Sequence, residues 1–315
     1  MGPEYRNPSE CTRNLRYSRR RRCTSMPKDL PDYAADPLRR FMDYARESER
    51  LLHISMRGLS MVQRAPQLLQ ALAKVEPILD HDVPADKQAA KALETQRSLE
   101  LAKTDAEFAD IEEKSGFPLL HAHTLVGLWG ALEAAIEDMM VGILLNEPQL
   151  LQSDAVGKVK IPIAEFETLE KEERMRLLIT EVERNCGYSK KFGVDCFDAL
   201  LETIGVAGAV DPEVKKTCRE MHSLRNVIVH RNSIVDRRLV SACPWLGLRI
   251  GDKVTVTHDD LGRYYRALIQ YGLAITYRLG ERYDVDIDAK IRHNLETEAK
   301  VGKDPGEVSQ SAVHT

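Results

Sequence analysis

The most informative stretch of this sequence is Arg225-Asn226-Val227-Ile228-Val229-His230. It places an arginine, an amide and, four residues after the amide, a histidine within about two turns of a helix. Arginine can bind two phosphate oxygens at once, and histidine transfers protons near neutral pH. No other part of the sequence combines a phosphate binder and a proton-transfer group so compactly.

Residues 211–230 are predicted to form the helix that carries this motif. Asp211 followed by Pro212 is a typical helix start, with the aspartate at the N-cap and the proline in the first helical position. At about 100° per residue, apolar side chains gather on one face and polar side chains on the opposite face. The apolar face holds Met221, Leu224, Val227 and Ile228, and the polar stripe holds His222, Asn226 and His230, with Arg219 beside it.

Arg225 does not lie on that polar stripe. The same arithmetic puts Arg225 about 140° around the helix from His230. One regular helix therefore cannot bring both side chains over a single phosphate. Either the end of the helix is distorted or a second copy of the chain supplies the missing half, and the second possibility predicts a homodimeric site.

Helical periodicity extends outward from the motif in both directions. Apolar residues between 125 and 143, at alternating steps of three and four, predict an amphipathic helix that ends before Pro148. Other helices are expected over 35–115, with an interruption between 77 and 84, and over 163–184, 191–205 and 261–282. Residues 246–257, centred on Gly251-Asp252, are expected to form a short β-hairpin.

These elements predict an all-α fold divided into four segments. Residues 1–27, rich in Arg, Ser and Pro, are expected to be a disordered basic arm, with Met26 as an alternative start. Residues 28–116 are expected to form an N-terminal helical hairpin region. Residues 117–285 then form a helical bundle with the small inserted β-hairpin, and 286–315 a polar tail.

The composition narrows the class of protein. Of 315 residues, 43% are apolar and 30% charged, with a net charge of −4, which permits a buried core and excludes a globally basic coat. Residues 211–238 nevertheless hold seven basic and four acidic residues.

Six scattered cysteines without CxxC spacing indicate reduced thiols in a cytoplasmic protein. Charges in the longest apolar helix argue against a membrane span.

The motif residues suit RNA cleavage by internal transesterification. That reaction needs a base for the proton of the 2′-hydroxyl and an acid for the leaving 5′-oxygen, and His230 can take either role. A fixed cation such as Arg225 stabilises the charge that builds on the phosphate. Asn226 can orient His230 or bind a phosphate oxygen. No metal or other cofactor is required.

The run from Arg225 to His230 resembles the Arg-polar-x-x-x-His signature of the HEPN superfamily. The likeness covers roughly residues 117–285, including the helix at 123–146 with Trp129-Gly130 and a final helix after the motif. The resemblance implies a helical domain that acts as a metal-independent endoribonuclease in prokaryotic defence or growth control. It also implies a homodimer with facing motif helices, and an antitoxin or effector protein as a possible partner.

Carried over residue by residue, the resemblance implies Arg225, Asn226 and His230 as catalytic residues. Arg219, His222 and Arg231 are expected to contact RNA from the same helix. One position departs from the pattern, because Ile234 stands where the toxins paired with nucleotidyltransferases have a tyrosine. The hairpin and the region before residue 117 are additions to the minimal bundle.

Other interpretations remain open at this point. Arg225 and His230 can simply cap the helix C-terminus and pair with acidic residues. His222 is then a surface histidine, and Glu133 and Glu137 form a solvated helix face. The same bundle can also be a non-catalytic dimeric module that binds RNA, a nucleotide or a protein. In a third interpretation, residues 28–116 recruit a partner for a structural role.

Overall fold

A computed structural model describes residues 29–79 and 84–292 of the chain. Residues Asp29–Ile287 form one compact unit. A second unit comprises Met1–Lys28 and Asp288–Thr315, of which 288–292 are described. The expected basic arm at 1–27 and most of the expected tail at 286–315 therefore lie outside the described residues.

The described chain is helical, which confirms the predicted all-α class, and none of its residues belongs to a β-strand. The α-helices are α1 (Asp32–Val62), α2 (Ala65–Leu79), α3 (Ala85–Lys114), α4 (Pro118–Asn146), α5 (Ile163–Thr168), α6 (Lys171–Asn185), α7 (Asp195–Glu202), α8 (Pro212–Arg231), α9 (Arg237–Ala242) and α10 (His258–Tyr283). Short 3-10 helices are η2 (Pro148–Gln152), η3 (Tyr188–Lys190) and η4 (Pro244–Leu246).

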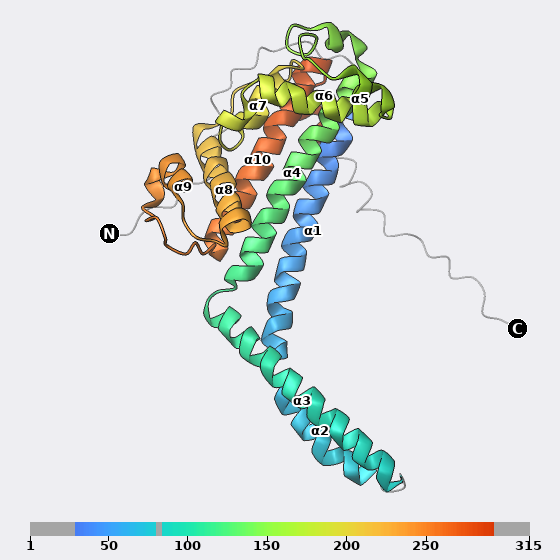
Figure 1. The fold of residues 1–315 in the computed structure, drawn as a ribbon, viewed down its shortest axis with the longest axis vertical. Coiled ribbons are helices and arrows are strands. Elements are labelled where there is room, and N and C mark those ends of the chain that lie inside the picture. Colours follow the sequence, from blue (N-terminus) through green and yellow to red (C-terminus); the bar gives the residue numbers. More distant parts are fainter. Residues whose placement is uncertain (1–28, 80–83, 293–315) are drawn as a thin grey trace, which may run out of the picture. The chain divides into compact units, whose positions relative to one another are not determined.

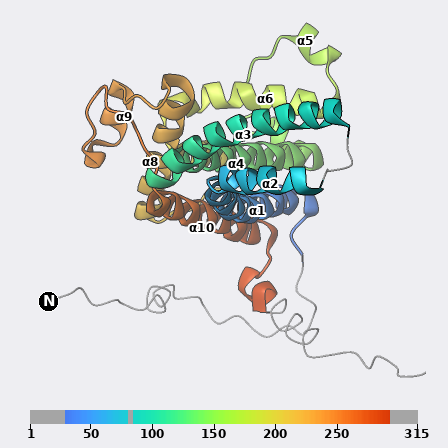
Figure 2. The same cartoon turned by 90° about the horizontal axis from the view of Figure 1, so that it is seen from below.

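Helix α4 lies at the centre of the Asp29–Ile287 unit. It packs against α1, α6, α8 and α10, and Figures 1 and 2 show α1, α4 and α10 side by side. The stripe that the sequence predicted for α4 is buried along its whole length: Leu125, Leu128, Leu132, Ile136, Met139 and Ile143. On α4, Gly142 allows the closest approach of α1, because a Cβ there would lie 2.3 Å from the carbonyl oxygen of Tyr33.

The region before residue 117 belongs to the same unit as the rest of the bundle. The first half of α1 is buried against α4 and α10, while α3 packs on α1 and α2. Three helices form here, because α1 ends at Val62 and α2 begins at Ala65. The predicted boundary at residue 116 is a turn between α3 and α4, with Phe117 in the left-handed region and Pro118 in the first turn of α4.

The β-hairpin expected at 246–257 does not form. Lys253 makes an isolated antiparallel bridge with Ile234 instead, and Val254 N–H donates to the Ser233 carbonyl at 2.7 Å. The carbonyl of Val256 accepts a hydrogen bond of 3.1 Å from Nδ1 of His121 on α4. Backbone groups that a hairpin would have paired locally are therefore used by the segment after α8 and by α4.

Within the described residues, no helix combines the length and the apolar character that a membrane crossing would need.

Candidate functional site

The motif helix α8 begins and ends where its local sequence requires. The Asp211 side chain accepts from the backbone N–H groups of Glu213 and Val214, and Pro212 occupies the first turn. At the other end, Asn232 adopts the left-handed conformation with φ 50°. Asparagine tolerates that conformation better than most residues, so the helix stops directly after His230 and Arg231.

The apolar face of α8 is fixed in the core. Met221, Leu224 and Val227 are buried as predicted, together with Val214 and Cys218. This face packs against α4 and α10. The opposite, polar face is consequently held in one orientation.

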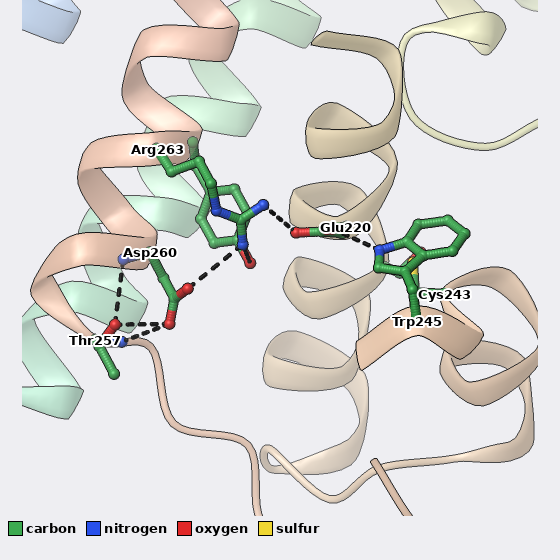
Figure 3. Close-up of polar contacts among 8 residues, drawn as sticks. Glu220, Cys243, Trp245, Thr257, Asp260 and Arg263 are labelled. Atoms are coloured by element: carbon green, nitrogen blue, oxygen red, sulfur yellow. Dashed lines mark hydrogen bonds and ion pairs between the residues drawn. The ribbon is translucent and has the colours of Figure 1, made fainter. Parts of the chain in front are cut away.

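A buried carboxylate ties α8 to α10 and to the segment after α9. Figure 3 shows Glu220 of α8 between Arg263 of α10 and Trp245 of η4. Trp245 Nε1 donates to Glu220 at 2.5 Å, and Arg263 donates to its other oxygen. Arg263 also reaches Asp260, which forms the capping box of α10 with Thr257. The Glu220 side chain is 4% exposed, so both donors are needed to compensate its burial.

The polar stripe of α8 lines a cleft of about 470 Å³. His222, Asn226 and His230 all contribute to its wall, as their shared face predicted. The other walls come from Lys191 and Phe192 in the loop before α7, from Arg231, and from Asp236, Arg238 and Leu239 at α9. Lys191 and Arg238 make no ion pair within the described residues. The cleft is therefore basic on balance.

His222 is fixed at the back of the cleft rather than exposed on the surface. Its ring stacks on Trp129 of α4, with centroids 5.0 Å apart and an interplanar angle of 15°. Gly193 N–H donates to Nδ1 at 2.9 Å, and the Asn226 amide nitrogen lies 3.1 Å from Nε2. Burial, and then the charge of Arg225, lower the pKa of His222 to about 4. His222 is thus neutral at pH 7 and brings no positive charge to a phosphate.

Arg225 points away from the cleft, toward α4. Its Nη2 donates to Glu133 at 3.4 Å, its Nη1 donates to Asn226 Oδ1 at 3.1 Å, and its buried Nε has no partner in the described structure. Glu133 also accepts from Trp129 Nε1 at 2.7 Å. The expectation that Glu133 lies on a solvated face is wrong, since the side chain faces the motif helix. Glu137 pairs with Arg176 at 2.9 Å instead.

The remaining predicted residues divide between two sites. His230 is exposed at the cleft and has no hydrogen-bond partner among the described residues. Arg231 lies beside it, with Nε 3.8 Å from Asp236. Arg219 lies outside this cleft, in a neighbouring pocket of about 390 Å³, where it pairs with Asp195 at 3.2 Å. Asp195 also pairs with Lys215 at 2.9 Å, and Arg219 is not placed with His230.

Sequence reasoning missed the loop that forms the opposite wall of the cleft. Lys190-Lys191-Phe192-Gly193 combines basic, aromatic and glycine residues, which was the available signal. Gly193 has φ 60°, and a Cβ there would lie 2.7 Å from the backbone N and Cα of Arg219. The loop can approach α8 this closely because residue 193 has no side chain.

Three of the four thiols in the described residues are buried. In the described part of the chain, Cys186, Cys196, Cys218 and Cys243 are free. Burial raises the pKa of Cys218, on the inner face of α8, to about 12, and the nearby Asp198 carboxylate adds to the shift. Nowhere in the described residues do three His, Cys, Asp or Glu side chains gather closely enough to hold a metal ion.

No family model, curated protein or solved structure matches this chain.

Proposed function

We propose that the cleft along α8 binds RNA and cleaves it without a metal ion, as part of a HEPN-like endoribonuclease. The observation that carries the proposal is the position of His230. It is an exposed histidine without a hydrogen-bond partner in the described chain, on one face with Asn226, in a cleft edged by Lys191, Arg231 and Arg238. A basic cleft attracts a phosphate backbone, and an unengaged imidazole is available to transfer a proton.

The arrangement of helices is also what the HEPN resemblance implies. The motif occupies the last turns of α8, α4 with Trp129 packs directly against α8, and α10 follows. These features support assignment to that superfamily without depending on overall sequence similarity.

In the proposed reaction, the 2′-oxygen attacks the adjacent phosphorus and the bond from phosphorus to the 5′-oxygen breaks. A base accepts the proton of the 2′-hydroxyl, and an acid donates a proton to the departing 5′-oxygen. The products are a 2′,3′-cyclic phosphate and a free 5′-hydroxyl. His230 performs one of the two proton transfers.

Arg225 supplies the cation for the charged phosphate in this proposal. Its bond to Glu133 is long at 3.4 Å, and its Nε is unpartnered in the described structure, so its present contacts are weak competitors for a phosphate. Because Arg225 faces α4 and His230 faces the cleft, we propose that the active form contains two copies. The second copy provides the other histidine and arginine across the two-fold axis.

The test is cleavage of single-stranded RNA by the full chain in EDTA. We expect His230→Ala to lose at least about 100-fold in rate, since general acid–base catalysis contributes roughly that much. Arg225→Ala is expected to lose about as much, because removing one group that stabilises transition-state charge costs on the order of 100-fold. His123→Ala is the matched control, because His123 is an exposed histidine on α4 outside the cleft. A substrate with deoxyribose at the cleavage position is expected to resist. Equal cleavage by the wild type and all three variants would refute the proposal.

A second function is favoured by the contacts of Arg225. In this second function, the bonds to Glu133 and Asn226 keep Arg225 in place against α4 when RNA binds. A non-catalytic module would then bind RNA through Lys191, Arg231 and Arg238. RNA binding that weakens steeply with salt, without any cleavage, distinguishes this function from the first.

A further inference from the structure

An apolar helix face lies exposed along α1 and α2, outside the residues that line the cleft. Its side chains are between 47% and 74% exposed. They recur at steps of three, four and seven, the spacing of a coiled-coil seam. The members are Leu51, Ile54, Met61, Leu68, Leu72 and Val75, and we call this face the α1–α2 seam.

The α1–α2 seam is open along its whole length. The positions that complete its repeat are Gly58 and Ala65, and a Cβ at Gly58 would meet no atom within 4 Å. The seam passes from the last turns of α1 into α2, across the turn between Val62 and Ala65. Continuous apolar surface of this kind marks an interaction site on a soluble protein.

One edge of the α1–α2 seam is basic. Arg50, Arg57 and Arg64 follow one another at seven-residue spacing, are exposed, and make no ion pair within the described residues. In a coiled coil, residues that flank the apolar seam select the partner by charge. The matching surface is therefore an apolar helix face with acidic residues at the same spacing. Two α1–α2 seams packed on each other would leave the arginines without acidic partners.

Helix α3 carries a face of that kind. Leu101, Phe108 and Ile111 are between 50% and 68% exposed and follow one another at steps of seven and three. We call these three residues the α3 outer face. Leu93 lies outside it, because the exposed Arg97 stands between Leu93 and Leu101.

Acidic residues follow the α3 outer face at the required spacing. Glu100 and Glu107 lie beside it, seven residues apart and exposed. Glu107 has no ion pair in the described structure, and Glu100 makes only an exposed i,i+3 pair with Lys103 at 2.8 Å. Exposed pairs of this type are worth little and are readily exchanged.

We propose that the α1–α2 seam of one copy packs against the α3 outer face of a second copy, with Arg57 and Arg64 facing Glu100 and Glu107. Both faces have apolar residues at heptad spacing, and their flanking residues carry opposite charge. Because different faces are joined, each copy retains one unused half of the contact, and the assembly continues head to tail into a ring or an open chain. Neither face includes α8, so the contact is separate from the proposed active dimer.

The test uses two charge-reversed versions of the full chain. One carries Arg57→Glu with Arg64→Glu, and the other carries Glu100→Lys with Glu107→Lys. Sedimentation velocity over a concentration series measures the mass of each protein alone and of an equal mixture. We expect the wild type to form larger species than either variant, with at least a tenfold weaker association constant in each variant. The mixture is expected to recover association, because each reversed face then meets an oppositely charged one.

A control separates the contact from a general effect of charge. Lys160→Glu with Lys171→Glu reverses two exposed lysines outside both faces and is expected to associate like the wild type. Unchanged far-ultraviolet circular dichroism shows that each variant folds. The proposal is overturned if the wild type is no heavier than the variants, or if the mixture stays as light as its components. Cleavage of RNA plays no part in this readout.

Discussion

At the scale of single residues, His222 and His230 on the polar stripe of α8 have different surroundings. His222 and His230 lie two turns apart on the same face of α8. His222 is stacked on Trp129, bonded through Nδ1 and neutral, whereas His230 is exposed at the cleft. Only the tertiary neighbours distinguish them. In the proposed reaction His230 is therefore the proton-transfer group, whereas His222 is held by Trp129 and Gly193 at the back of the cleft.

The lowered pKa of His222 predicts how stability depends on pH. In the unfolded chain this histidine takes up a proton below about pH 6.5, whereas in the native state it stays neutral down to about pH 4. Stability from His222 is therefore fully present above about pH 6.5 and is lost as the pH falls toward 4, by on the order of 3 kcal/mol.

The measurement compares urea unfolding from pH 7 to pH 4.5. His222→Phe keeps the stack on Trp129 and cannot titrate, so its stability is expected to fall less steeply than that of the wild type. His123→Gln, which removes an exposed histidine, is expected to leave the slope unchanged. A His222→Phe slope equal to the wild-type slope would contradict the assignment.

At the scale of elements, the loop before α7 can lie close against α8 because residue 193 is a glycine. We expect Gly193→Ala to lower the free energy of unfolding by more than about 1 kcal/mol, because the new Cβ meets backbone atoms of Arg219 at a positive φ. Gly187→Ala is the matched control, since Gly187 also has a positive φ of 72° but no atom within 4 Å of the added Cβ. Chemical denaturation of both variants checks this. Equal losses would show that backbone conformation alone, not contact with α8, accounts for the effect.

The sequence predicted a helix correctly where residues within that helix determine its position. The stripe from Leu125 to Ile143 and the Asp211-Pro212 start lead to α4 and α8 as expected. Helical arithmetic also placed Arg225 off the face of His230. The failure at residues 246–257 has a distant cause. The carbonyl of Val256 is bonded to His121, 135 positions away in the chain, and Val254 is bonded to Ser233, so no β-ladder forms within this segment.

The candidate site was predictable only on the motif helix itself. Asn226 and His230 share a cleft because they share a face of α8. Lys191 and Phe192 entered the site through tertiary packing, and Glu133 reached Arg225 from α4, 92 positions earlier. A helical repeat carries information about one helix, whereas the opposite wall of this cleft is supplied by the loop before α7.

At the scale of the whole Asp29–Ile287 unit, α4 joins the core to the site. Its buried stripe organises α1, α6 and α10, while Trp129 and Glu133 on the same helix contact His222 and Arg225. Disturbing the middle of α4 is therefore expected to affect the cleft even where no cleft residue changes. The α1–α2 seam and the α3 outer face lie on other helices, and the two sets of surfaces can be altered independently.

The rate at which buried Cys218 is alkylated can measure how often the motif helix opens. An alkylating reagent attacks the thiolate, and Cys218 has both a raised pKa and a fully buried side chain on the inner face of α8. Its modification requires the motif helix to lift from α4 and α10, so its rate counts opening events. Among the four cysteines of the described residues, Cys186 is only half-buried and is expected to react first. A ligand that binds across the cleft should slow Cys218 and leave Cys186 unchanged, which residue-resolved mass spectrometry can follow.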